Sequence, residues 1–300
     1  MEIQKSGLIA LVGRPNVGKS TLLNRLAGEK VAIVTDKPQT TRHRITAVAT
    51  RGTRQFVFLD TPGFHRPRNR LGEHMVRLVR ETTLGVDAVV LMVEPVARVG
   101  TPEALLIEQL TRARAGEAPP AVLVINKIDT VKKDALLAVI EIYRPALPWV
   151  AVIPLSARDG DGVASLFDEL APLLPEGPAL YPEGQVTDQP DRMLIAEIVR
   201  EKLLNHLAQE VPHGVAVVTD TLHERENGLV DIGVTIVCER ESHKGILIGR
   251  HGAMLKQVGQ EARAELEEMY GGPVHFQSWV KVKTDWRDKP GQLRDLGFDF

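Results

Sequence analysis

Glycine, lysine and serine stand near the N-terminus at a spacing that suits phosphate binding. Residues 13–20 match G-x-x-x-x-G-K-[ST], a phosphate-binding pattern when it follows a strand and opens a helix. Its glycines let backbone N–H groups close around phosphate, and the helix N-terminus adds positive dipole. Lys19 would reach the β- and γ-phosphates, and Ser20 would offer a hydroxyl to Mg²⁺. The predicted loop comprises Gly13, Arg14, Pro15, Asn16, Val17, Gly18, Lys19, Ser20 and Thr21, and a plain glycine turn is the alternative.

A second candidate segment, Asp60-Thr61-Pro62-Gly63, ends a predicted strand. Asp60 would hold Mg²⁺ through a water, and the Gly63 N–H would sense a γ-phosphate. Between the two segments lies the polar run 37–44, KPQTTRHR, in which one threonine would close over Mg²⁺. We expect this ligand to be Thr41, with Thr40 as the alternate. A solvated loop is the other interpretation of this run.

A third segment, Asn126-Lys127-Ile128-Asp129, follows the apolar run AVLVI and indicates guanine. The Asp129 carboxylate can accept from both N1–H and the exocyclic amine of guanine, a donor pair that adenine lacks. The Lys127 stem would lie along the base, Asn126 would brace the phosphate loop, and Ser156-Ala157 would offer a backbone N–H to guanine O6. All these segments end predicted strands, where parallel sheets bind their ligands.

The residues expected to act in hydrolysis are Lys19, Ser20, Thr41, Asp60 and Gly63. Phe64 stands where Ras-type proteins carry the glutamine that orients the attacking water. Because phenylalanine has no hydrogen-bonding group, we expect slow intrinsic hydrolysis. Asn16 is a candidate ligand for K⁺, whose charge near the β/γ bridge could replace an arginine finger. The alternative is that Asn16 only shapes the loop.

The first 175 residues alternate short apolar runs with helical patterns, which predicts a mostly parallel sheet between helices. Six strands are expected, at 6–12, 44–50, 55–60, 88–94, 121–126 and 150–155. Helices are expected at 19–27, 71–84, 102–115, 134–143 and 163–173. The predicted fold is an α/β P-loop GTPase domain over residues 1–175, with a six-stranded sheet.

Residues 176–191 are rich in proline and glycine and are typical of a linker. The pattern then becomes helix (192–207), strand (214–221), strand (229–239), two helices and a final strand (274–282). This α-β-β-α-α-β order predicts a small separate α+β domain over residues 192–300, including a C-terminal tail.

Gly249-Arg250-His251-Gly252 lies between the two adjacent helices of that second domain. G-x-x-G in this position is the arrangement of an RNA-binding KH domain of type II, although most isolated matches are turns. The two glycines allow the backbone to approach a sugar–phosphate chain closely, and basic residues nearby attract it. The expected RNA contacts are Lys244, Ile246, Ile248, Gly249, Arg250, His251, Gly252, Lys256, Lys281 and Lys283.

The charge balance excludes a chain held on nucleic acid by bulk charge alone, because 37 Lys and Arg face 39 Asp and Glu. The first 180 residues are mildly basic and the remainder is acidic, so RNA attraction must be local. Trp279 and Trp286 could stack on a base, with burial in the core as the alternative. The single cysteine, Cys238, excludes an intramolecular disulfide and is expected inside a strand. With no signal peptide or membrane-spanning run, we expect a soluble, cytoplasmic protein.

The sequences GRPNVGKS, PQTTRHR, DTPGFH and NKID, followed by a type II KH domain, resemble the bacterial Era GTPases over essentially the whole chain. The resemblance implies GTP and GDP as ligands, Mg²⁺ as cofactor, and GTP contacts at 13–20, 60–64 and 126–129. It implies RNA contact at 246–252, binding of 16S ribosomal RNA near its 3′ end, and assistance to assembly and maturation of the small (30S) ribosomal subunit. It also implies peripheral association with the inner face of the cell membrane. No DNA partner is expected.

Two other functions were considered. One is a nucleotide-gated adaptor at a membrane surface whose hydrolysis is incidental, but the sequence has no obvious amphipathic anchor. The other is a GTPase of the tRNA-modifying kind, which shares the GRPN-GKS and TTR motifs but carries other appended domains.

Overall fold

The computed structural model describes residues 2–113, 119–208 and 211–298. The chain divides into two compact units. One comprises residues 1–32, 38–68 and 72–188, and the other comprises residues 33–37, 69–71 and 189–300. Each unit is described separately.

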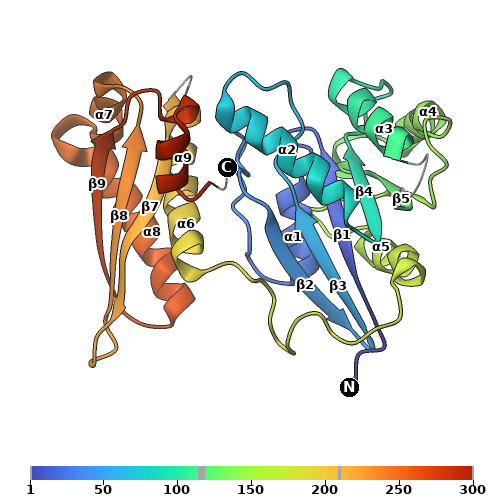
Figure 1. The fold of residues 1–300 in the computed structure, drawn as a ribbon, viewed down its shortest axis with the longest axis horizontal. Coiled ribbons are helices and arrows are strands. Elements are labelled where there is room, and N and C mark those ends of the chain that lie inside the picture. The colour runs from blue at the N-terminus through green and yellow to red at the C-terminus, as the bar shows by residue number, and fades with distance from the viewer. Residues whose placement is uncertain (1, 114–118, 209–210, 299–300) are drawn as a thin grey trace. The chain divides into compact units, whose positions relative to one another are not determined.

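The first unit contains a six-stranded sheet (Figure 1). Its strands are β1 (Lys5–Gly13), β2 (Ile45–Arg51), β3 (Arg54–Asp60), β4 (Ala88–Val93), β5 (Ala121–Ile125) and β6 (Val152–Pro154), in the order β2-β3-β1-β4-β5-β6. Only β2 pairs antiparallel, with β3, and every other neighbouring pair is parallel. The mostly parallel six-stranded sheet expected from the sequence is confirmed.

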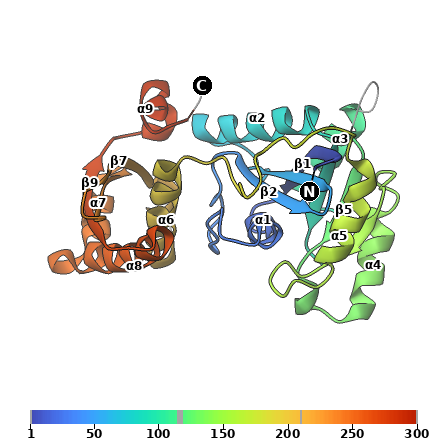
Figure 2. The ribbon, with the colours of Figure 1, turned by 90° about the horizontal axis from the view of Figure 1, so that it is seen from below.

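Helices cover both faces of this sheet (Figure 2). Residues of α1 (Lys19–Ala27) and α5 (Val163–Leu170) share one buried cluster with β1, β2 and β3. Residues of α2 (Arg70–Leu84), α3 (Thr101–Ala113) and α4 (Lys133–Tyr143) share a second cluster with β1, β4 and β5. Short 3₁₀ turns lie at Ile128–Thr130 and Ala171–Leu173. Covered on both faces, β4 and β5 are wholly apolar, as buried parallel strands are.

The proline-rich segment after α5 is packed on this first unit up to residue 188. The buried Gln55 side chain accepts from the Leu180 and Tyr181 N–H groups, at 2.7 and 2.9 Å, and donates to the Tyr181 carbonyl. The Thr187 hydroxyl donates to the Thr46 carbonyl at 2.7 Å. Composition indicated a linker here, and these bonds show that the segment is tied to β2 and β3.

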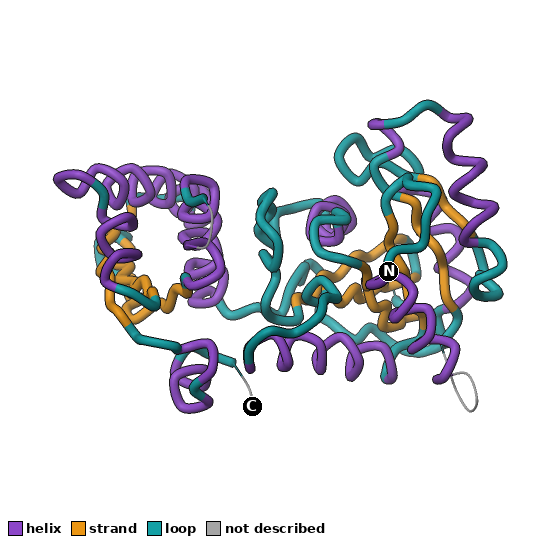
Figure 3. Tube along the Cα trace, turned by 90° about the horizontal axis from the view of Figure 1, so that it is seen from above, coloured by secondary structure: helices purple, strands orange, loops and turns teal. Residues whose placement is uncertain are grey.

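The second unit has a three-stranded sheet with helices on one face (Figure 3). Its elements are α6 (Asp191–His206), β7 (Ala216–Glu224), β8 (Val230–Cys238), α7 (Glu241–Ile248), α8 (Ala253–Tyr270), β9 (Val274–Val282) and α9 (Pro290–Asp295), with 3₁₀ turns at Val211–Gly214, Arg250–Gly252 and Trp286–Asp288. Strand β8 is central, antiparallel to β7 and parallel to β9. This is the expected α-β-β-α-α-β order, with α9 as an addition that the sequence did not indicate.

The core of this unit decides between the two alternatives left open for Trp286, stacking on a base or burial in the core. Trp286 is fully buried and its Nε1–H donates to the Gly214 carbonyl at 3.0 Å, so a base-stacking role for this residue was wrong. Trp279 remains about half exposed. Cys238 is buried at the end of β8, as expected. None of the described helices combines the length and apolar character needed to cross a bilayer.

Candidate nucleotide and RNA sites

The predicted phosphate loop connects β1 to α1, at the carboxyl edge of the sheet. Gly18 has φ 101°, and a Cβ at this position would lie 2.2 Å from Nδ2 of Asn126. The Asn126 amide fills that space and donates to the Val17 carbonyl at 2.8 Å. The glycine is therefore required both by its backbone conformation and by the close approach of the guanine-loop asparagine.

Two buried side chains of opposite charge lie next to this loop. Lys19 and Asp60 are both buried, and Lys19 Nζ donates to the Gly13 and Arg14 carbonyls at 3.4 and 3.3 Å. Burial lowers the pKa of Lys19, partly offset by the negative charge of Asp60. Burial likewise raises the pKa of Asp60, offset by Lys19 and by hydrogen bonds from Ser20, Thr41 and the Thr61 backbone. Each charge is held in a site that water does not reach, which strengthens its attraction for a charged ligand.

Two hydroxyl-bearing side chains, Ser20 and Thr41, lie beside Asp60. The Ser20 hydroxyl donates to Asp60 Oδ2 at 2.7 Å and lies 2.9 Å from the Thr41 hydroxyl. Asp60 Oδ1 is buried without a hydrogen-bond partner among the described residues. An unpaired carboxylate oxygen beside two hydroxyls is the donor set of a hard cation such as Mg²⁺. Of the two threonines considered, it is Thr41 that lies beside Ser20 and Asp60.

The segment after Asp60 lies against the phosphate loop. A Cβ on Gly63 would lie 2.6 Å from the Pro15 Cα, so only glycine fits there. The Phe64 N–H donates to the Gly13 carbonyl at 3.0 Å, and the Phe64 ring is buried in the cluster under α2 and α3. Phe64 is thus a core residue that also ties the two loops together.

The guanine-loop residues meet Ser156 and Ala157 at the ends of β5 and β6. Ser156 Oγ donates to Asp129 Oδ1 at 2.8 Å, and the Ala157 N–H donates to Asn126 Oδ1 at 2.9 Å. The other Asp129 oxygen pairs with the exposed Arg158 at 2.9 Å. The sequence reasoning missed Arg158, although it directly follows Ser156-Ala157. Its guanidinium is paired with the carboxylate that was predicted to accept hydrogen bonds from guanine.

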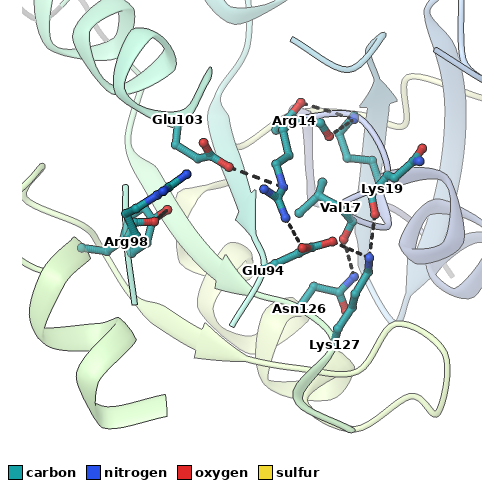
Figure 4. A network of polar contacts seen from close by, with 11 residues as sticks. Arg14, Val17, Lys19, Glu94, Arg98, Glu103, Asn126 and Lys127 are labelled. Carbon is teal, nitrogen blue, oxygen red and sulfur yellow. Dashed lines mark hydrogen bonds and ion pairs between the residues drawn. The ribbon is translucent and has the colours of Figure 1, made fainter. Parts of the chain in front are cut away.

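A network of charged side chains spans the loops, and sequence reasoning missed two of its members (Figure 4). Glu94 lies between Arg14 and Lys127 and forms an ion pair with each. Arg14 Nε also lies 3.6 Å from Oε1 of Glu103, a buried carboxylate in the first turn of α3. Lys127 Nζ donates to the Asn16 carbonyl at 2.7 Å.

The remaining predicted nucleotide contacts lie in the same loops. Thr61 is fully buried and donates to the Leu11 carbonyl at 2.9 Å. Asn16 is exposed with φ 60°, at the tip of the phosphate loop. Pro62 is buried, whereas Thr21 and Ile128 are partly exposed.

The second unit carries a groove next to its G-x-x-G segment. Gly249 has φ 72°, and a Cβ there would lie 2.7 Å from Cβ of Met254. Beyond it, a cavity of about 360 Å³ lies between α8 and β9, lined by Gly252, Leu255, Lys256, Gly259, Gln260, Arg263, Phe276 and Ser278. Of the predicted RNA contacts, Gly252 and Lys256 line this groove. Sequence reasoning missed Gln260, Arg263, Phe276 and Ser278.

The other predicted RNA contacts are spread around the groove. Ile246 is 48% exposed, and Ile248 and Lys244 are partly exposed on α7, whereas Arg250 and His251 are exposed in the loop itself. Lys281 follows the groove residue Ser278 by three positions on β9. Because successive side chains of a strand point to opposite faces, Lys281 lies on the other face of β9, the face that also carries Trp279. Lys283 pairs with Asp295 at 3.5 Å.

Comparison with known proteins matches both units. Residues 8–127 fit the family model described as 50S ribosome-binding GTPase, and residues 210–287 fit the KH domain model. GTPase Era of Heliobacterium modesticaldum is 46% identical over 100% of this chain and 99% of its own length. GTPase Era of Alkaliphilus metalliredigens is 45% identical over 98% and 99%. The chain belongs to the Era GTPase family.

Solved structures of Era agree with this assignment. A structure of Era in complex with MgGDPNP and nucleotides 1506–1542 of 16S ribosomal RNA superposes with a TM-score of 0.93, at 36% identity, over 99% of this chain and 100% of that one. A point variant of Aquifex aeolicus Era bound to GDP·AlF4⁻ gives the same values. As an Era protein, the chain is a GTPase with a P-loop domain followed by a KH domain.

Proposed function

We propose that this Era-family GTPase is a GTP-dependent switch that binds 16S ribosomal RNA near its 3′ end through its KH domain and assists assembly and maturation of the small ribosomal subunit. The observation that carries the proposal is that one chain holds both a guanine-nucleotide loop set and a KH groove. Similarity to an Era structure containing MgGDPNP and nucleotides 1506–1542 of 16S ribosomal RNA supports it.

In the nucleotide half, the backbone N–H groups of residues 13–21 other than Pro15 would bind the phosphates, with Lys19 as the buried cation. Asp129 would accept hydrogen bonds from guanine, and the base would thereby replace Arg158 as the partner of this carboxylate. The stem of the Lys127 side chain would lie along the base. Gly63 lies against Pro15, so a γ-phosphate entering here would be sensed by the segment 60–64. Burial of Phe64 leaves no side chain at that position to orient water, which supports slow intrinsic turnover.

Two cations enter this proposal. Ser20 and Thr41 would bind Mg²⁺ directly and Asp60 through a water; the unpaired Asp60 Oδ1 supports this assignment. When bound, Mg²⁺ neutralises phosphate charge that develops during hydrolysis. Asn16 would hold K⁺ at the exposed tip of the loop. Equal kcat values in Na⁺ and K⁺ would refute the K⁺ assignment.

In the RNA half, Gly249–Gly252 would let a single strand approach the backbone, and bases would enter the groove between α8 and β9. Lys256 and Arg263, the second of which also pairs with Glu267 at 2.8 Å, bring positive charge to this groove in a domain that is acidic as a whole. The exposed Ile246 and Arg250 would extend the contact onto α7 and the loop. A groove of this kind suits unpaired RNA rather than duplex DNA.

The experiment separates the two halves. Gly249→Asp places a side chain against Met254 and a negative charge in the loop, so binding to a 16S 3′-terminal oligonucleotide should fall at least tenfold while GTP hydrolysis persists. Gly291→Asp adds the same charge in α9, where a Cβ has open space, and is the matched control. Equal RNA affinity of the two variants would contradict the KH assignment.

The place of action is also a proposal. We infer action in the cytoplasm on the small subunit, with the peripheral membrane association that the family resemblance implies. Sedimentation with vesicles of anionic lipid tests the membrane part, and failure to co-sediment would remove it. No observation among the described residues favours the adaptor function over a hydrolysing switch.

A further inference from the structure

Glu94 occupies the central position at the carboxyl edge of the sheet. It directly follows β4, and β4 lies between β1, which leads into the phosphate loop, and β5, which leads into the guanine loop. A side chain at this point can reach both loops. Neither the phosphate-loop motif nor the guanine motif includes it.

The Glu94 carboxylate uses both oxygens on these loops (Figure 4). Oε2 pairs with the Arg14 guanidinium of the phosphate loop, and Oε1 pairs with Nζ of Lys127 at 2.5 Å. Its side chain is 21% exposed, so the two pairs are only partly screened by water. Glu94 therefore bridges two cations that belong to different loops.

Lys127 combines an unusual backbone conformation with a side chain that is fixed at its far end. Its φ is 64°, in the left-handed region that a lysine seldom adopts. Its Nζ is anchored at both Glu94 and the Asn16 carbonyl, which fixes the far end of a side chain built on a flexible four-carbon stem. The stem of the side chain is thereby fixed before any base arrives.

We propose that Glu94 is a positioning residue that preorganises the guanine pocket by holding Lys127 against the phosphate loop. This inference rests on the proposed nucleotide site. A side chain already ordered loses less conformational freedom when the ligand binds, so the gain appears as nucleotide affinity. Because Lys127 would act on the guanine base, which GDP and GTP share, the affinities for both nucleotides gain by the same factor.

The test is Glu94→Gln, which keeps the shape but removes the charge. The Kd for a fluorescent GDP and the KM for GTP should both rise about tenfold, with kcat unchanged. Glu108→Gln is the matched control, because Glu108 pairs with Arg112 on the exposed side of α3, and it should leave the Kd within twofold of wild type. A Glu94→Gln variant that loses thermal stability but keeps the wild-type Kd would show a structural role only and overturn the proposal.

A second comparison checks that Glu94 acts through Lys127. In a Lys127→Met background, Glu94→Gln should cause no further rise in Kd, because the group that Glu94 holds is already absent. A full tenfold effect in that background would refute positioning through Lys127. Failure of the wild-type protein to bind guanine nucleotide would instead refute the proposed nucleotide site.

Discussion

The close approach of Gly18 and Asn126 gives a sharp test of how the phosphate and guanine loops depend on each other. Gly18→Ala would place a methyl group 2.2 Å from Asn126 Nδ2, at a residue with φ 101°. Gly28→Ala makes the same chemical change at the other end of α1, at φ 83°, where a Cβ has nothing within 4 Å. Comparing the two variants therefore separates the effect of backbone strain, which both share, from the clash with Asn126, which only Gly18→Ala has.

The expected magnitudes follow from what each methyl group meets. Alanine in a left-handed conformation costs about 1–2 kcal/mol, and both variants bear this cost. In Gly18→Ala the Asn126 amide must also leave the Val17 carbonyl, and an unsatisfied buried group costs about 1–3 kcal/mol. Taking about 2 kcal/mol for the difference, the nucleotide affinity of Gly18→Ala should be roughly 30-fold lower than that of Gly28→Ala.

The assay is a fluorescence titration with labelled GDP, run beside thermal unfolding without nucleotide. Gly28→Ala should lower Tm by a few degrees and keep the GDP affinity within about threefold of wild type, because strain alone does not reach the site. If Gly18→Ala binds GDP as tightly as Gly28→Ala does, the two loops are not locked together as the contact implies. The reasoning would then be refuted.

Three further predictions concern the base, the RNA groove and a surface contact of the KH domain. Asp129→Asn replaces a double acceptor with a group that also donates, so GDP affinity should fall by about 10³-fold or more in a binding titration while xanthosine diphosphate is favoured over GDP. Arg263→Gln should weaken RNA binding several-fold and reduce the slope of log K against log salt by about 0.7, whereas Arg294→Gln in α9 should not. The hydrogen bond from His206 lowers the pKa of Glu261, so this carboxylate adds stability above its unfolded pKa and loses that contribution as pH falls. Glu261→Gln should therefore lower Tm at pH 7 but not at pH 3, in thermal unfolding followed by circular dichroism; an equal loss at both pH values would exclude the His206–Glu261 contact as the cause.

The motif residues could be found from the sequence because each motif follows a strand whose pattern is unambiguous. Apolar runs such as β4 and β5 identify buried parallel strands, and the glycines and polar residues after them mark the binding edge. Glu94 could not be found in this way, because a single carboxylate after a strand matches no pattern. Its role follows from the order of β1, β4 and β5 in the sheet, which is a property of the fold.

Some other features of the structure had a signal in the sequence that was not used, and others had no signal. Lys256, Gln260 and Arg263 stand at i, i+4 and i+7 and so share one face of α8, a periodicity that could have extended the predicted RNA surface. The packing of 176–188 on Gln55 had no such signal, because proline and glycine content indicates turns without saying what they contact. A tryptophan lies more often in the core than against a base, and the full burial of Trp286 with its indole bonded to the Gly214 carbonyl decides for the core.

The nucleotide site is also where the first unit departs from an apolar core. Asp60 Oδ1 and Glu103 Oε2 are both buried without a hydrogen-bond partner among the described residues, and Lys19 is buried beside Asp60. Buried polar groups left unpaired destabilise a fold, so their clustering at one edge is a local cost within a sheet that is otherwise well packed. A ligand that supplies phosphate oxygens to Lys19 and a cation to Asp60 removes part of that cost. In the proposed nucleotide complex, the same groups that destabilise these loops would favour binding, and the stability of the loops would then depend on their occupancy.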